Sequence, residues 1–160
     1  MKKIALITGA SKGIGKALAK KMLNEGFIVI GTSRSGKIND IEDKDFHSIK
    51  LDLSNPESIE DAHKEILKKF KGIDILINNA GIGPDLDTYY PERKSFNLTF
   101  DINVNGTVFF TEPLIESINE NGAILNISSK MGSLHVCELT DSVAYRMSKS
   151  ALNMYTKILA

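Results

Sequence analysis

The chain has 160 residues, with 42% hydrophobic side chains and 20 basic residues balanced by 20 acidic ones. This length suits one domain with an ordinary hydrophobic core, so we expect residues 1–160 to form a single domain. The charge balance gives no reason to expect nucleic acid or a membrane surface as a partner.

Several other classes are disfavoured by particular residues. The apolar run at the N-terminus breaks at Thr8 and Gly9, which is too early for a secretory signal. No run approaches the roughly 18 apolar residues of a membrane span. Cys137 has no second cysteine to pair with, and no group of His, Cys, Asp and Glu has the spacing of metal ligands. We therefore expect a cytoplasmic protein without a metal.

Short apolar runs alternate with segments of helical periodicity along the chain. The runs predict strands over 4–8, 27–31, 46–52, 73–78 and 123–128, and the last two are apolar enough to be covered on both faces. Ser54 to Glu57 has capping-box spacing, which predicts a helix capped by Ser54. A long helix is expected over 97–119, kinked or shifted at Pro113, and a last one begins near Val143. Repeated strand–helix units predict an α/β fold of Rossmann type, a doubly wound parallel sheet with helices on both faces.

A glycine-rich turn lies between the first strand and the first helix. Backbone N–H groups at a helix N-terminus bind a pyrophosphate where no side chain blocks its approach. Gly9 permits the turn, Gly13 the close approach of the phosphates, and Gly15 the packing of helix on strand. The order of strand, turn and helix favours this interpretation over a merely tight turn. Its predicted cofactor-binding residues are Gly9, Ser11, Lys12, Gly13, Ile14 and Gly15.

The end of the second strand predicts which dinucleotide is preferred. An acidic residue there would bind the adenosine ribose of NAD, but Ser33 and Arg34 occupy the position instead. A hydroxyl and a guanidinium suit a 2′-phosphate, and Lys12 adds a second positive charge. The pattern therefore predicts NADP(H), although Arg34 by itself is also compatible with an ordinary solvated loop.

Five motifs in order resemble the short-chain dehydrogenase/reductase family over essentially the whole chain. They are the turn from Thr8 to Gly15, Asn78-Asn79-Ala80-Gly81, Asn103 within 101–106, Ser129 after the fifth strand, and Tyr145-x-x-x-Lys149. Within the family, residues 145–153 look most like the small carbonyl-reductase-type members, those similar to sniffer and to bacterial C-factor.

The chemistry of the last motif follows from its spacing. Tyr145 and Lys149 are four residues apart and share one helix face, and a nearby ammonium favours loss of a phenol proton. The resemblance implies that Tyr145 donates the proton during carbonyl reduction, that Lys149 also holds the nicotinamide ribose, and that Ser129 hydrogen-bonds the substrate oxygen. It further implies that Asn103 positions a water in a proton relay to Lys149.

Other residues receive less definite roles. The resemblance assigns Asp52, followed by Leu53, to the adenine, but a loop aspartate before the helix cap is an equally good interpretation. Asn79, Ala80 and Gly81 are expected along the adenosine side, or alternatively in a turn that stabilises the sheet. His135 and Cys137 lie between Ser129 and Tyr145, where they either line the substrate pocket or belong to an ordinary loop.

The resemblance also implies parts that this sequence lacks. Family members continue with two further strands and a helix, so we expect residues 1–160 to be a fragment, with 123–127 as an exposed apolar edge prone to aggregation. We expect a homodimer or larger even oligomer built through Val104, Val108, Ala151, Leu152 and Tyr155. The predicted function is an NADPH-dependent oxidoreductase acting on a small carbonyl or alcohol substrate. The alternative is a non-enzymatic nucleotide-binding or signalling protein of the same fold.

Overall fold

A five-stranded parallel sheet forms the centre of the computed structural model, which describes residues 2–160. The strands lie in the order β3-β2-β1-β4-β5. Their bounds are β1 Ile4–Ile7, β2 Ile28–Ser33, β3 Phe46–Lys50, β4 Ile73–Asn78 and β5 Ile118–Asn126. All four pairings are parallel, as the Rossmann-type prediction requires, so the predicted fold class is confirmed.

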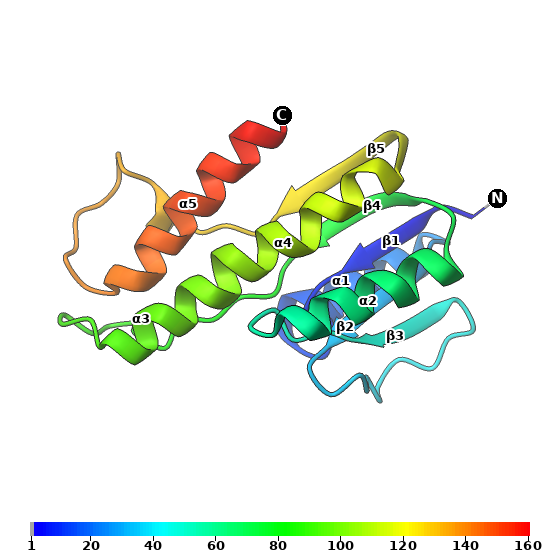
Figure 1. Cartoon of the computed structure of the whole chain (residues 1–160), viewed down its shortest axis with the longest axis horizontal. Coiled ribbons are helices and arrows are strands. Elements are labelled where there is room, and N and C mark those ends of the chain that lie inside the picture. The colour runs from blue at the N-terminus through cyan, green and yellow to red at the C-terminus, as the bar shows by residue number, and fades with distance from the viewer. Residues whose placement is uncertain (1) are drawn as a thin grey trace.

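Helices cover both faces of this sheet (Figure 1). Helix α1 (Gly13–Asn24) lies behind it in the view, and α2 (Pro56–Lys69) and α4 (Thr107–Thr111) lie in front. Because side chains alternate along a strand, Ala5 and Ile7 of β1 join the α1 cluster while Leu6 joins the opposite one. The second cluster contains Phe110 of α4, which is completely buried.

The long helix expected over 97–119 is longer at its start, shorter at its end, and irregular. It begins as α3 (Arg93–Phe100), widens into the π-helical turn η1 (Asp101–Gly106), and returns to α-helix in α4. A 3₁₀ segment, η2 (Glu112–Ser117), completes it, and Asn119 already belongs to β5. Pro113 lies at the start of η2, so the expected shift occurs where its missing N–H would otherwise bond.

Two local predictions are wrong. Helix α2 is capped by Asn55, whose side chain accepts a hydrogen bond from the Ser58 N–H, so Ser54 is not the cap. The Ser54 hydroxyl instead donates to Asp52 Oδ1 at 2.7 Å. Strand β5 is not covered on both faces, because its exposed and half-buried residues alternate.

Strand β5 is the outer strand of the sheet and pairs only with β4 among the strands of residues 2–160. Its residues Ala123 and Leu125 are exposed, so the expected apolar edge is present. The last helix, α5 (Val143–Leu159), runs beside α3 and η1, with the short 3₁₀ turn η3 (Lys130–Gly132) packed against it. The segments that follow β4 and β5 reach the N-terminal half of α5, where Asp85 accepts from the Ala144 N–H and the Ile127 carbonyl oxygen accepts from Lys149.

Candidate active site

The glycine-rich turn packs α1 tightly onto the end of β1. Gly9 has a φ of +68°, a backbone conformation that residues other than glycine rarely adopt. Gly15 is buried, and a Cβ at this position would lie 2.4 Å from the Gly9 carbonyl oxygen and from Asn79 Nδ2. Only glycine fits there, because the nearest atom is backbone and cannot move aside. The turn is therefore open at its outer side and closed beneath.

The segment after β4 is tied to this turn by hydrogen bonds. The Thr8 hydroxyl accepts from the backbone N–H groups of Asn79 and Ala80, both at 3.0 Å. The Asn79 side chain donates to the Thr8 carbonyl oxygen at 2.9 Å. Asn79 thus stabilises the end of the sheet, as in the alternative interpretation of this motif. Ala80 and Gly81 remain beside the open side of the turn.

A cavity of about 360 Å³ opens where these segments meet. The predicted cofactor-binding residues that line it are Gly9, Ser11, Lys12, Gly13, Ile14, Ser33, Arg34, Asp52, Leu53, Asn79, Ala80 and Gly81. Sequence reasoning missed Thr32, Leu51, Ile82 and Ile102, which also line it. Thr32 and Leu51 lie at the carboxyl ends of β2 and β3. Ligands of parallel α/β sheets bind at the carboxyl ends of the strands, and this rule could have identified both residues from the sequence. Gly15 lies beneath the turn, and Tyr145 and Lys149 lie on α5.

Ile14, one of the predicted cofactor-binding residues, lies in the first turn of α1. Its surface is 62% exposed. It lines the cavity, whereas Leu18 and Met22 pack against the core. An exposed isoleucine beside a glycine turn offers an apolar surface to a ligand.

Positive charge gathers at the end of the cavity formed by β2. Lys12 and Arg34 are exposed, and neither forms an ion pair with a carboxylate of residues 2–160. The Ser33 hydroxyl is buried and donates to the Lys37 carbonyl oxygen at 3.3 Å, so it contributes to the loop as well as to the cavity wall.

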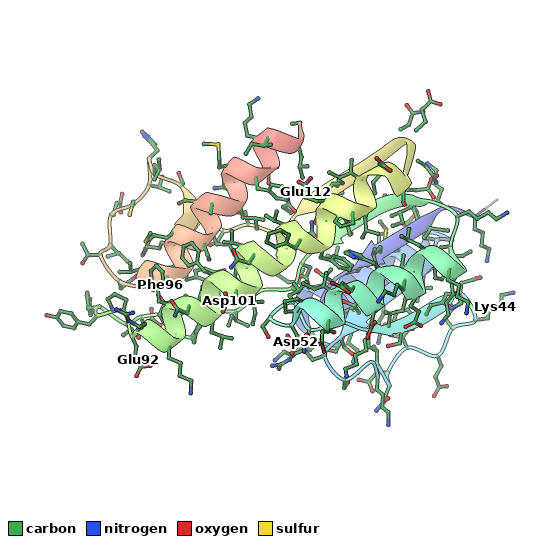
Figure 2. All side chains as sticks on the ribbon, viewed as in Figure 1. Lys44, Asp52, Glu92, Phe96, Asp101 and Glu112 are labelled. Atoms are coloured by element: carbon green, nitrogen blue, oxygen red, sulfur yellow. The ribbon has the colours of Figure 1, made fainter. Side chains whose placement is uncertain are left out.

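Asp52 lies across the same cavity, where α2 begins (Figure 2). Its carboxylate accepts from the Ser54 hydroxyl and from the Ser54 N–H. The Ser54 hydroxyl lowers the pKa of Asp52 most, and the Ser54 N–H and the charge of Arg34 lower it further against the effect of burial. Asp52 therefore presents a fixed, ionised acceptor to the cavity.

Helix α5 carries the tyrosine and lysine on one face. Lys149 Nζ lies 5.7 Å from the centre of the Tyr145 ring and donates to the Ile127 carbonyl oxygen at 2.8 Å. Burial lowers the pKa of Lys149, because the charged form is less favoured away from water. A Cβ added to Gly81 would come within 3.5 Å of Lys149 Nζ, so the ammonium lies next to the cavity wall.

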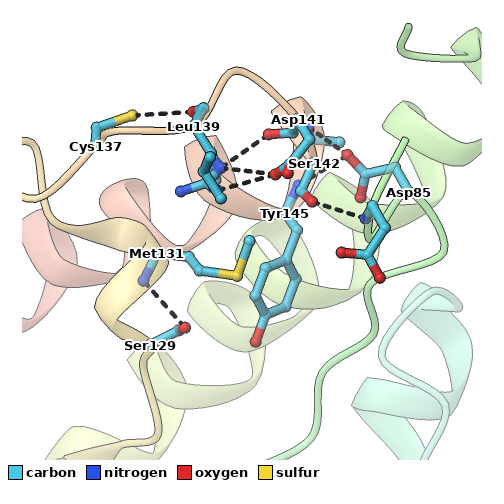
Figure 3. A network of polar contacts seen from close by, with 11 residues as sticks. Asp85, Ser129, Met131, Cys137, Leu139, Asp141, Ser142 and Tyr145 are labelled. Atoms are coloured by element: carbon cyan, nitrogen blue, oxygen red, sulfur yellow. Dashed lines mark hydrogen bonds and ion pairs between the residues drawn. The ribbon is translucent and has the colours of Figure 1, made fainter. Parts of the chain in front are cut away.

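Ser129 begins the turn η3, and its hydroxyl accepts from the Met131 N–H at 3.2 Å. Figure 3 shows Ser129 on the same side as the hydroxyl end of the Tyr145 ring. Asn153 of α5 fixes the segment around it, since it accepts from the Ser128 hydroxyl and donates to the Gly132 carbonyl oxygen. The helix that presents Tyr145 thus also holds the loop that presents Ser129.

Asn103 lies in the π-helical turn η1 and is buried. Its side chain accepts from the Ile82 N–H and donates to the Ile82 carbonyl oxygen, both at 2.8 Å, and also donates to Ser148 Oγ at 3.0 Å. Both amide hydrogens are therefore used within the protein. This side chain joins the cavity wall to α5 and fixes these two segments relative to one another. The expected role of Asn103 in positioning a water stays a prediction.

His135 and Cys137 lie in an exposed loop before α5, and the Cys137 thiol donates to the Leu139 carbonyl oxygen at 3.7 Å (Figure 3).

The described part of the chain contains no cluster of three or more His, Cys, Asp and Glu suited to a metal ion. It also contains no helix long and apolar enough to cross a membrane.

A Rossmann sheet with an open glycine turn at its carboxyl edge defines a dinucleotide-binding domain. Residues 3–160 match the short chain dehydrogenase family, and the chain belongs to that family. It is 36% identical over 166 residues to 3-oxoacyl-(acyl-carrier-protein) reductase of Buchnera aphidicola subsp. Baizongia pistaciae (strain Bp), covering 99% of this chain and 66% of that protein.

Solved structures agree with this assignment. A 3-ketoacyl-(acyl-carrier-protein) reductase of Brucella melitensis complexed with NADH has a TM-score of 0.86 and 30% identity, covering 99% of this chain and 69% of that one. A short-chain dehydrogenase/reductase of Burkholderia multivorans with bound NADP has a TM-score of 0.87 and 26% identity, covering 100% and 73%. The chain spans about two thirds of the length of the curated relatives it matches.

The close contact at Gly15 gives a prediction. Gly15→Ala should displace the turn, because the added Cβ would lie 2.4 Å from the Gly9 carbonyl oxygen. A loss of about 1.4 kcal/mol of binding free energy would weaken dinucleotide affinity about tenfold, which fluorescence titration with NADPH and with NADH would measure. Gly26→Ala is the control: Gly26 also has a positive φ, of +83°, but lies in open space at the far end of α1. Equal affinities in the two variants would contradict this account of the turn.

Proposed function

We propose that the protein is an NADP(H)-dependent oxidoreductase that interconverts a carbonyl compound and its alcohol. The observation that carries the proposal is the position of Lys149 Nζ, between the Tyr145 ring and the wall of the dinucleotide cavity at Gly81. A phenol, an ammonium and the Ser129 hydroxyl are the groups that a carbonyl reduction needs beside a bound nicotinamide. When bound, the reduced nicotinamide supplies the hydride.

Each residue of this set has a separate task in the proposed reaction. Tyr145 gives its hydroxyl proton to the oxygen of the carbonyl, and the same group takes the proton back in the oxidative direction. The Ser129 hydroxyl donates a hydrogen bond to that oxygen, where negative charge develops. Lys149, held by Ile127, places its positive charge beside the Tyr145 ring and offers its remaining N–H groups to the nicotinamide ribose. Water relayed toward Lys149 would have to be held by groups other than the Asn103 amide hydrogens.

The alternative, a nucleotide-binding or signalling role without catalysis, needs only the cavity. Family membership favours an oxidoreductase, since binding alone would not require Ser129, Tyr145 and Lys149 together. Relatives named 3-oxoacyl reductases make 3-oxoacyl thioesters one carbonyl class to include beside simple ketones and aldehydes in a substrate panel. NADPH consumption over that panel separates the two roles, because a binding protein would consume none.

The second prediction concerns the acid. Tyr145→Phe keeps the ring but removes the transferable proton, so turnover should fall by about 10²-fold or more while NADPH affinity stays nearly unchanged. Lys149→Ala should lower both turnover and affinity, because Lys149 is assigned two tasks. Stopped-flow and equilibrium titration measure the two quantities. Tyr90→Phe, at a residue that is 87% exposed, is the control. Retention of most of the activity by Tyr145→Phe would show that another group is the acid.

The choice of NADP(H) over NAD(H) is also part of the proposal. Its support is a pair of cations, Lys12 and Arg34, which have no ion-pair partner among residues 2–160. They lie at the end of the cavity where an acidic residue would otherwise bind a ribose. An arginine fork suits the oxygens of a 2′-phosphate, and each charge-assisted hydrogen bond there is made only to the phosphorylated cofactor.

The third prediction follows. Arg34→Asp should reverse or abolish a preference for NADPH, because a carboxylate repels the 2′-phosphate and accepts from a ribose hydroxyl instead. Equilibrium titration of each variant with NADPH and NADH measures the preference directly. Arg93→Asp, an exposed arginine at the start of α3, carries the same charge change outside the cavity and should leave the preference unaltered. If the unsubstituted protein binds both cofactors equally, the proposed preference is wrong.

The fourth prediction concerns assembly, which we propose is a homodimer or a larger even oligomer formed through α4 and α5. Two residues expected in the interface are excluded: Leu152 and Tyr155 are buried within the chain, and Tyr155 donates to Glu112 at 2.8 Å. Phe109, Met154 and Ile158 are instead more than half exposed on these helices. Light scattering of the protein and of Phe109→Asp should show an oligomer that the charged variant weakens. A monomer at micromolar concentration would refute the assembly.

A further inference from the structure

The first turn of α5 is held from outside the helix by a buried carboxylate. Asp85 lies in the loop that follows β4 and is 3% exposed. Its Oδ2 accepts from the backbone N–H of Ala144 at 2.7 Å and from that of Tyr145 at 3.3 Å. These N–H groups have no partner inside the helix, because the first turn of any helix leaves its donors free. The helix has no side-chain cap of its own, since Ser142 makes no capping bond.

The same loop makes two further bonds to the residue that precedes the helix. The Ser142 N–H donates to the Thr88 carbonyl oxygen at 2.9 Å, and the Asp87 N–H donates to Ser142 Oγ at 3.0 Å. Ser142 has a φ of +54°, a left-handed conformation that a non-glycine residue keeps only where its surroundings enforce it. Figure 3 shows Asp85, Ser142 and Tyr145 together in this network.

The other end of this loop is the wall of the cofactor cavity. Asn79 to Ile82 line the cavity, and Ile82 is fixed by both polar groups of the Asn103 amide. Between the two ends, Gly83 lies against the Tyr145 ring, where an added Cβ would be 2.9 Å from Tyr145 Cδ2. A single stretch of ten residues, 79–88, therefore contacts the cavity, the tyrosine ring and the start of the tyrosine helix.

We propose that Asp85 is a positioning residue that sets the distance between the Tyr145 hydroxyl and the nicotinamide end of the cavity. It acts through backbone N–H groups and touches neither substrate nor cofactor. The inference rests on the proposed oxidoreductase function and adds a residue to it. Reacting groups must be held closely, and a misplacement of 1 Å can slow turnover about 10²-fold. Asp85 Oδ1 has no hydrogen-bond partner among residues 2–160, so Oδ2 alone joins this loop to the first turn of α5. We therefore expect the position of that oxygen to matter more than the charge of the side chain.

The test compares three substitutions at this residue with a control on the same loop. Asp85→Ala removes the acceptor, Asp85→Asn keeps an acceptor oxygen at the same length, and Asp85→Glu keeps the carboxylate but moves it by one methylene. Asp87→Asn is the control, because Asp87 is exposed and asparagine tolerates its φ of +62°. For each variant, kcat, KM, NADPH affinity and hydrogen exchange of the Ala144 and Tyr145 amides are measured.

Asp85→Ala should lower kcat about 10²-fold, with KM and NADPH affinity changed by no more than roughly threefold, and the two amides should exchange at least about tenfold faster. Asp85→Asn should recover most of kcat, whereas Asp85→Glu should not. If Asp85→Ala does not fold, the comparison of kcat between Asp85→Asn and Asp85→Glu tests the proposal. A positioning role predicts a lower kcat for Asp85→Glu than for Asp85→Asn.

Three results would overturn the assignment: an Ala variant as fast as the Asp87→Asn control, Asn and Glu variants of equal rate, or amides whose exchange is unchanged in Asp85→Ala. The proposed function fails separately. If the unsubstituted protein consumes no NADPH with any carbonyl compound, the oxidoreductase assignment falls and the catalytic role of Asp85 falls with it. If the protein is active and the substitutions at Asp85 leave kcat unchanged, the positioning role alone is refuted.

Discussion

The contact between the glycine turn and the end of β4 is the constraint on which the rest of the site depends. Gly15 can approach the Gly9 carbonyl only because it lacks a side chain, and Asn79 fills the space that remains. The Thr8 hydroxyl then fixes the backbone of Asn79 and Ala80. These bonds tie the start of the segment after β4 to the glycine turn, and residues 81–88 continue from there. Helix α5 is attached to those residues through Asp85 and Thr88.

The site consequently has two parts with different physical origins. The cofactor cavity is made by backbone, with open glycine positions and strand ends, and its charged groups sit at the rim. The proposed reactive part is made by side chains of α5 and by Ser129 at the start of η3, and Asn153 joins these two segments. Asn103 connects the two, since its amide binds Ile82 of the cavity wall and Ser148 of α5. A π-helical turn places that amide, and such turns are frequent at functional sites because the wider turn redirects one side chain.

The sequence predicted the elements that depend on local pattern and failed where tertiary contacts decide. The bounds of β4 and the start of α5 were predicted closely, because a short apolar run and an amphipathic periodicity are local signals. The spacing predicted Ser54 as the cap of α2, whereas Asn55 is the cap. The Ser54 hydroxyl donates to Asp52 instead, and the spacing of residues does not reveal that contact. The π turn within 97–119 left no local trace. Asp85 went unnoticed because its partners are backbone N–H groups far along the chain.

The buried lysine connects the stability of the sheet edge to the site. Lys149 loses much of its hydration on burial, and its one hydrogen-bond acceptor within residues 2–160 is the carbonyl of Ile127, the residue after β5. Within residues 2–160, strand β5 is paired on one side only. The position of Ile127 therefore depends on β4 and on the Ile127 N–H bond to the Asn78 carbonyl oxygen. Any strand that pairs with the open edge of β5 would restrain the carbonyl that holds the ammonium. Loosening that edge would leave a buried charge without its acceptor, which is costly in an apolar environment. Order at the sheet edge and placement of Lys149 are therefore one requirement, even though the edge lies outside the cofactor cavity.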